Sequence, residues 1–365
     1  MNRMTLVWIG IIAAALAGCG DDNRAVQPQG RMDATVSAIP VTAGPTASGR
    51  SERRVFGDWN ATCDNGHRCA AHSGLGTGSW LMVRLDAGPD ARPEILMNMS
   101  AISGVAIRLV IDGQSQTLIG PKGDAVAFRV PPADVPATLV RLAAAREVTL
   151  VAPDFENEIP TAGASAALLW IDERQGRLGT VTALIRKGDR PAATVPAAPA
   201  LPAVVAARVI NQSGFGDEAQ TLPAALEALP AVKACRAETS YNADISQAVM
   251  SARLDASTEL WAVPCFSGAY NIGHDWYVTG PGGRDPRPAT LASADGKPSS
   301  GTVNGVYDPD TRTIQAFNKG RGLGDCGVAS TWTWTGRTFV LIEESAMDEC
   351  EGMPSDLWPT TWRTR

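Results

Sequence analysis

Residues 305–342, GVYDPDTRTIQAFNKGRGLGDCGVASTWTWTGRTFVLI, indicate the class of fold. The run contains four short segments of β-favouring residues, and turn-forming residues separate them at Asp308–Thr311 and Thr335–Arg337. No helix-forming stretch connects these segments, whereas neighbouring parallel strands need such a crossover. The run therefore predicts antiparallel pairing. The four expected strands are 305–307, 313–317, 331–335 and 338–342.

The same pattern of short strands and turns extends through most of the chain. Helices are few, and we expect them at 135–145, 162–175 and 221–235, the last of them ended or kinked by Pro230. We therefore expect an α+β fold that is predominantly antiparallel β, with a few short helices. The further expected strands include 79–85, 94–99, 105–111, 115–119, 148–151, 180–185, 260–266 and 276–279.

The N-terminus has the features of a secretion leader. Arg3 precedes an apolar stretch at 6–16, which is shorter than the ~20 residues of a membrane-spanning helix. The tetrad Leu16-Ala17-Gly18-Cys19 resembles the lipobox of bacterial lipoproteins. This resemblance implies a lipoprotein signal peptide at 1–18 and lipidation of Cys19, so that the lipid anchors the protein to a membrane facing the periplasm. Gly20 after the cysteine favours the outer membrane over the inner membrane.

The cysteine count indicates the same oxidising compartment. Seven cysteines less Cys19 leave an even set of six, which an oxidising envelope would pair. Fifteen pairings are possible, and we expect the one that joins sequence neighbours, because those bonds stay within one folding unit. The tract from Cys63 to His72 resembles a zinc cluster at first sight, but oxidised thiols do not bind metal as thiolates, so we expect no metal. The expected disulfides are Cys63–Cys69, Cys235–Cys265 and Cys326–Cys350.

The composition predicts two domains on a tether. The chain has 365 residues, of which 44% are hydrophobic, enough for two folding units after the leader is removed. Ala, Thr, Pro, Gly and Ser dominate 19–50, which is typical of a flexible, lipid-anchored tether. Four prolines among Ala and Val mark a linker at 191–207. We expect an N-terminal β-rich domain at 51–190 and a C-terminal disulfide-stabilised β-rich domain at 208–365.

The sequence offers little support for nucleic-acid binding, cofactors or catalysis. The net charge is −6 and the basic residues do not cluster, so we expect no nucleic-acid partner. Residues 322–327 fit G-x-G-x-x-G, but they lack the preceding strand and following helix that dinucleotide binding requires. No G-x-S-x-G, P-loop or H-E-x-x-H motif occurs in the sequence. We therefore expect no cofactor and name no catalytic residue.

Four residues are the candidates for ligand binding. Trp332 and Trp334 share a strand face through their spacing of two, and they could form a stacking platform or pack in the core. Arg321 lies near Asp325 in a glycine-rich loop, where the pair could hold an anion or form a structural salt bridge.

Short motifs rich in glycine, cysteine and aromatic residues recur along the chain: FGDW at 56–59, CDN at 63–65, AALLWID at 166–172, PCFSGAYN at 264–271, GRGLGDCG at 320–327, CEG at 350–352 and WPTTWR at 358–363. Together these motifs resemble the bacterial envelope family known as domain of unknown function 1176. The resemblance covers nearly all of 51–365, and it implies export and disulfides but no catalytic residue. The opening FGDW with its nearby cysteine also resembles, more weakly, the invasion-associated locus B family.

These observations predict an exported lipoprotein that binds an envelope protein or polymer, or serves assembly or stress resistance, without catalysing a reaction. Two alternatives are an envelope-polymer hydrolase that uses carboxylates near the Arg321 loop and a periplasmic inhibitor of a hydrolase.

Overall fold

The computed structural model describes residues 49–365 except 77, 100–104, 124 and 209–220. Contacts group residues 46–365 into one compact unit. The predicted signal peptide, the predicted lipidation site Cys19 and nearly all of the predicted tether lie outside the described residues. The domain boundaries remain predictions.

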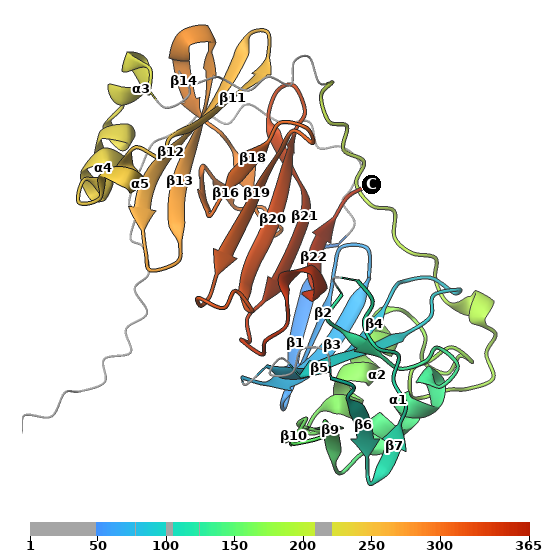
Figure 1. Ribbon diagram of the computed structural model, residues 1–365. Coiled ribbons are helices and arrows are strands. Elements are labelled where there is room, and N and C mark those ends of the chain that lie inside the picture. The colour runs from blue at the N-terminus through green and yellow to red at the C-terminus, as the bar shows by residue number, and fades with distance from the viewer. Residues whose placement is uncertain (1–48, 77, 100–104, 124, 209–220) are drawn as a thin grey trace, which may run out of the picture. The chain divides into compact units, whose positions relative to one another are not determined.

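The first half contains a six-stranded antiparallel sheet and a four-stranded antiparallel sheet (Figure 1). Two helices, α1 (Val135–Ala144) and α2 (Ala164–Arg174), complete this half. The six-stranded sheet has the order β1 (Glu52–Phe56), β2 (Trp59–Cys63), β3 (Cys69–Leu75), β4 (Ser79–Leu85), β5 (Glu94–Met99) and β8 (Phe128–Arg129). The four-stranded sheet has the order β10 (Glu156–Glu158), β9 (Val148–Val151), β6 (Arg108–Ile111) and β7 (Gln114–Gln116).

Apolar side chains on the two faces of β4 pack into two different cores, one on each side of the six-stranded sheet. Leu81 and Val83 belong to the core that includes α1 and α2, whereas Trp80 and Met82 pack with residues near the C-terminus such as Trp358. Side chains alternate across a strand, so a near-continuous apolar run such as SWLMVRL supplies both cores. The first half therefore shares a core with the C-terminal segment.

The second half contains two five-stranded sheets and three short helices (Figure 1). The first sheet comprises β11 (Met250–Asp255), β12 (Thr258–Ser267), β13 (Ile272–Gly280) and β14 (Arg284–Pro288), with β17 (Gly301–Val303) also on β13. The second has the order β18 (Val306–Asp308), β19 (Thr313–Lys319), β20 (Gly327–Trp334), β21 (Phe339–Met347) and β22 (Thr360–Arg363). The remaining elements are α3 (Ala224–Glu227), α4 (Pro230–Thr239), α5 (Ala243–Ser246), the pair β15 (Leu291–Ala292) and β16 (Pro298–Ser299), and the 3₁₀ turns Ala192–Thr194, Pro281–Gly283 and Ser355–Leu357.

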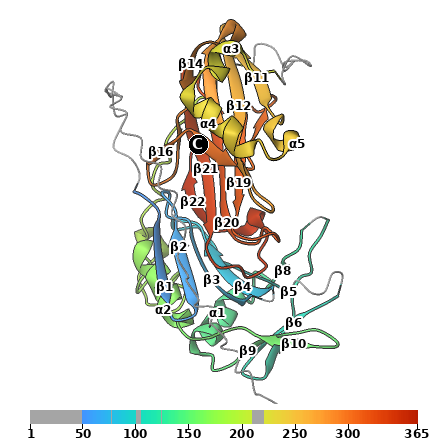
Figure 2. The ribbon, with the colours of Figure 1, turned by 90° about the vertical axis from the view of Figure 1, so that its left-hand side faces the viewer.

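The β12–β13 sheet is covered on both faces. Helices α4 and α5 lie over β12 (Figure 2), and Val232 of α4 packs there with Trp261 and Val263. On the other face, Leu260 and Trp276 share a core with Ile314 and Trp332 of the second sheet. The two sheets therefore pack face to face as a sandwich.

The expected fold class and disulfides are confirmed. Every strand pairing between the named elements is antiparallel, and the helices are short. The structure contains the expected bonds Cys63–Cys69, Cys235–Cys265 and Cys326–Cys350. In the part of the chain that is described, no helix combines the length and the apolarity needed to cross a bilayer.

One local prediction was wrong. Residues 180–185 form turns, because the buried carboxylate of Asp172 accepts the N–H groups of Leu184 and Ile185 and ties the segment to α2. The helical stretch expected at 221–235 is interrupted next to Pro230, as predicted, and it forms two helices, with α3 ending at Glu227 and α4 beginning at Pro230. Proline suits the first turn of a helix, because the N–H group that it lacks would have no partner within the helix there.

Candidate functional site

A cleft of about 410 Å³ lies between the two sheets of the second half. Strands β12, β13 and β17 line one side, and β19, β20 and β21 line the other. The lining combines the aromatic side chains of Phe266 and Trp332 with eight polar or titratable residues: His274, Asp275, Ser293, Ser299, Thr302, Asn318, Ser330 and Glu344.

Strand register places three cleft-lining residues of the second sheet in one row. Ser330 pairs with Ala316 on β19 and with Glu344 on β21, and all three line the cleft. Trp332 follows Ser330 by two residues, so alternation puts both on the same face of β20. The pairing of β19, β20 and β21 therefore builds one wall of the cleft.

Phe266 forms part of the opposite wall and is 43% exposed. Its ring lies directly on Gly273, where a Cβ atom would come within 1.9 Å of a ring carbon. Glycine at 273 thus lets the ring lie flat on the neighbouring strand. An exposed aromatic face of this kind can stack on a ligand.

Hydrogen bonds hold the carboxylate of Glu344 in place. Ser330 Oγ and the Ala294 N–H each donate to Oε2 at 3.3 Å, and Thr361 Oγ1 donates to Oε1 at 2.9 Å. Glu344 is 8% exposed. Three donors around a buried carboxylate fix its orientation, so Glu344 can accept a further hydrogen bond without moving.

The first sheet adds two titratable residues, His274 and Asp275. Burial lowers the pKa of His274 to about 4, although a hydrogen bond with the Ala248 backbone raises it in part. The imidazole is therefore neutral at neutral pH. Among the described residues, its buried Nδ1 has no hydrogen-bond partner. Burial also raises the pKa of Asp275.

The structure separates the two candidate tryptophans. Trp332 lines the cleft, and its Nε1 donates to the Ala292 carbonyl at 2.7 Å, which fixes the ring. Trp334 is 1% exposed and packs with its ring centroid 5.2 Å from that of Phe339. Of the two, only Trp332 lines this cleft.

Arg321 and Asp325 form a two-pronged salt bridge and are not among the residues that line the cleft. Arg321 Nε donates to Asp325 Oδ1 at 2.7 Å, and Nη2 donates to Oδ2. Asp325 also accepts the Gly352 N–H at 2.7 Å, and the Arg321 guanidinium donates to the Cys350 carbonyl at 3.1 Å. These bonds join the glycine-rich loop to the segment of the Cys326–Cys350 disulfide. The arrangement is that of the structural bridge, the simpler of the two interpretations of the sequence.

We predict that Asp325→Ala destabilises the fold by about 2 kcal/mol, because it removes three hydrogen bonds to a buried carboxylate. The hydrogen bonds from Arg321 lower the pKa of Asp325, which is consistent with a stabilised charged form. Urea unfolding at neutral pH measures the change. The control is Asp310→Ala, at an exposed aspartate. Equal stability of the two variants would show that the bridge does not support the fold.

The described residues contain two groups of three metal-ligating side chains. One comprises Cys235, Cys265 and Asp275, and the other comprises Asp325, Cys326 and Cys350. All four cysteines form disulfides, so their sulfur atoms do not act as thiolate ligands. Neither group is therefore a candidate metal site.

The sequence did not identify Phe266 or Glu344 as site residues. Phe266 lies in the PCFSGAYN motif, whose aromatic residues and glycine were a signal available from the sequence. Glu344 lies in an ordinary strand, and only the packing of two sheets brings it to the cleft.

Comparisons with known proteins agree on one family. A family model described as protein of unknown function (DUF1176) matches residues 53–365. The chain is also 30% identical over 354 residues to the uncharacterized protein YpfG of Escherichia coli (strain K12). This alignment covers 86% of the present chain and 93% of YpfG. No solved structure matches this chain.

Proposed function

This chain belongs to the DUF1176 family, and from that premise we propose that it is a lipid-anchored binding protein of the bacterial cell envelope. The proposed ligand is a hydroxyl-rich segment of an envelope polymer, held in the cleft between the two sheets of the second half.

The proposed location is supported by the leader and by the cysteines. Lipidation at Cys19 would hold the protein on a membrane facing the periplasm, with the outer membrane favoured because glycine follows that cysteine. Three disulfides suit an oxidising compartment. The weaker resemblance to the invasion-associated locus B family remains a prediction, and the proposal does not depend on it.

The composition of the cleft is the single observation that carries the proposed ligand class. Serine, threonine and asparagine side chains both donate and accept hydrogen bonds, as sugar hydroxyl groups do. The exposed ring of Phe266 adds an aromatic surface on which an apolar sugar face can stack, and the buried Trp332 forms part of the cleft lining. A cleft of about 410 Å³ lies within the range of small-molecule sites and suits one or two sugar rings.

Photo-crosslinking in intact cells tests the proposal. We replace Phe266 by the photoreactive p-benzoylphenylalanine and identify the adducts by mass spectrometry. The matched control is the same replacement at Tyr270, which is also 43% exposed but does not line the cleft. We expect at least ~10-fold more saccharide adduct at 266 than at 270, because hydrophobic stacking and hydrogen bonds concentrate the ligand there. The same spectra should show a mature chain that begins at lipidated Cys19.

Other results would contradict the proposal. Equal amounts of saccharide adduct at 266 and 270 would show that the cleft is not the binding site. An unprocessed chain that begins at Met1 would contradict the envelope location. A hydrolase recovered as the adduct at 266 would support an inhibitor in place of a polymer-binding protein. Release of new chain ends from purified cell-wall polymer by the purified protein would support an enzyme.

A further inference from the structure

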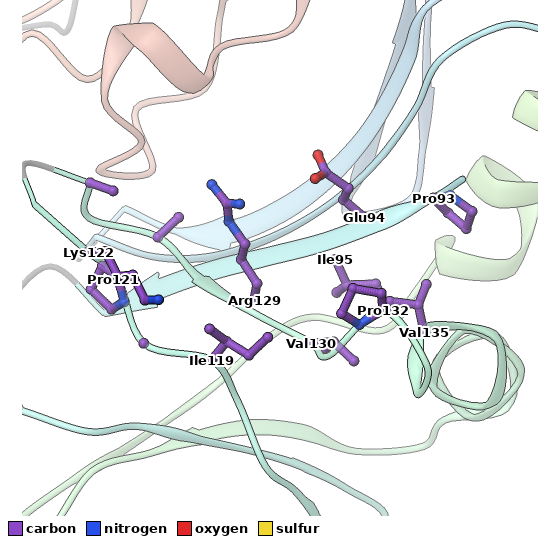
Figure 3. Close-up of a pocket in the computed structure, with 13 residues that line it drawn as sticks. Pro93, Glu94, Ile95, Ile119, Pro121, Lys122, Arg129, Val130, Pro132 and Val135 are labelled. Atoms are coloured by element: carbon purple, nitrogen blue, oxygen red, sulfur yellow. The ribbon is translucent and has the colours of Figure 1, made fainter. Parts of the chain in front are cut away.

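The first half has a second concave surface, an apolar groove of about 320 Å³ beside β8 (Figure 3). Strand β5, the loop after Ile119 and the start of α1 form its walls. Its apolar lining includes Pro93, Ile95, Ile119, Pro121, Val130 and Val135.

Backbone hydrogen bonds fix an exposed apolar side chain in this groove. Ile119 and Arg129 exchange backbone hydrogen bonds at 2.8 and 3.0 Å, so the position of Ile119 is fixed. Its side chain is nevertheless 43% exposed. Pro93 and Pro121 have no backbone N–H that would need water. A fixed apolar surface of this kind gains free energy when a partner covers it.

Two positive charges line the groove and have no negative partner among the described residues. The third charged residue of the lining, Glu94, pairs with Arg84 at 2.7 Å. Across the described ranges, no carboxylate lies within salt-bridge distance of Lys122 or Arg129, and both side chains are exposed. Figure 3 shows them on separate segments, the loop after Ile119 and strand β8. The described lining therefore presents two unpaired positive charges, on a chain whose net charge is −6.

We propose that this groove docks an extended peptide segment of a partner protein, in which acidic residues alternate with apolar ones. Apolar side chains would enter the groove, and carboxylates would pair with Lys122 and Arg129. Two cations on separate segments suit a peptide that carries several carboxylates better than a fatty acid that carries one. The small volume also suits two or three side chains rather than an entire long-chain ligand.

Selection from phage-displayed random nonapeptides on the immobilised mature protein tests this inference. We expect enriched sequences to contain Asp or Glu beside Leu, Ile, Val or Phe. Fluorescence anisotropy then measures the binding of one enriched peptide. The double variant Lys122→Glu/Arg129→Glu should weaken this binding by at least ~10-fold, because it replaces attraction by repulsion. Arg146→Glu reverses an exposed charge outside the groove, so it should change the affinity for the peptide by less than about twofold.

Three results would overturn the proposal. They are a selection that enriches no acidic and apolar pattern, an enriched peptide that binds the double variant as tightly as the natural protein, and saturable binding of dodecanoate at the groove in place of the peptides. Circular dichroism of both variants verifies that they are folded. The cleft in the second half is a separate surface, so this test is independent of the proposed function.

Discussion

Replacing Cys235 and Cys265 together by serine is expected to lower the free energy of unfolding by about 4 kcal/mol. These cysteines are 30 residues apart, and the bond between them reduces the number of conformations that the unfolded chain can adopt. The bond also fastens α4 to β12, where the helix covers one face of the sheet. Urea unfolding monitored by tryptophan fluorescence measures the loss, because Trp261 lies in the core beneath α4.

The matched control is the double serine variant at Cys63 and Cys69, which are only six residues apart. A shorter loop restricts the unfolded chain less, so this variant is expected to lose about 2 kcal/mol. Equal losses in the two variants, or a larger loss at Cys63 and Cys69, would contradict the assignment of the stabilisation to loop length.

Lowering the pH from 7.5 to about 4.5 is expected to destabilise the protein by about 2 to 3 kcal/mol through His274 alone. The pKa of His274 is about 4 in the folded protein because the ring is buried, whereas the ordinary pKa of a histidine side chain is 6.5. Between these two values the unfolded chain binds a proton that the folded protein does not bind. Stability therefore falls as the pH decreases from about 6.5 to about 4, and below that range the loss is complete.

His274→Gln should reduce the difference in stability between these two pH values by a similar amount. Urea unfolding of both proteins at both pH values measures it, since the contribution of all other groups is common to the pair. The control is His67→Gln, a substitution of the same kind at a half-buried histidine. If His274→Gln keeps the full pH dependence of the natural protein, buried His274 is not its source.

The elements of the fold that depend on local chemistry could be predicted from the sequence. Turn residues around Asp308 separate β18 from β19, and turn residues around Gly336 separate β20 from β21. The spacing of Val135 and Leu142 predicts α1. The strand expected at 180–185 shows the limit of this reasoning. Its composition favours β structure, but a buried carboxylate from a neighbouring helix binds its backbone and holds it in turns.

The candidate site was only partly predictable for the same reason. The spacing of Trp332 and Trp334 correctly puts them on one face of a strand, and both are buried in one core. Their different roles depend on what lies opposite each ring, Ala292 and the cleft in one case and Phe339 in the other. The sequence spacing of Arg321 and Asp325 was compatible with both an anion site and a salt bridge, and their hydrogen bonds show the salt bridge.

The count and order of the cysteines, the turn chemistry and the apolar periodicity were sufficient to predict an antiparallel, disulfide-bonded fold, because each depends on residues close together in the chain. The cleft and the groove depend on packing between distant segments. Register across three strands brings Ser330 beside Glu344, and the stacking of two sheets sets them opposite Phe266. Such contacts are determined by how whole sheets bury their apolar faces, and no local pattern records which faces meet.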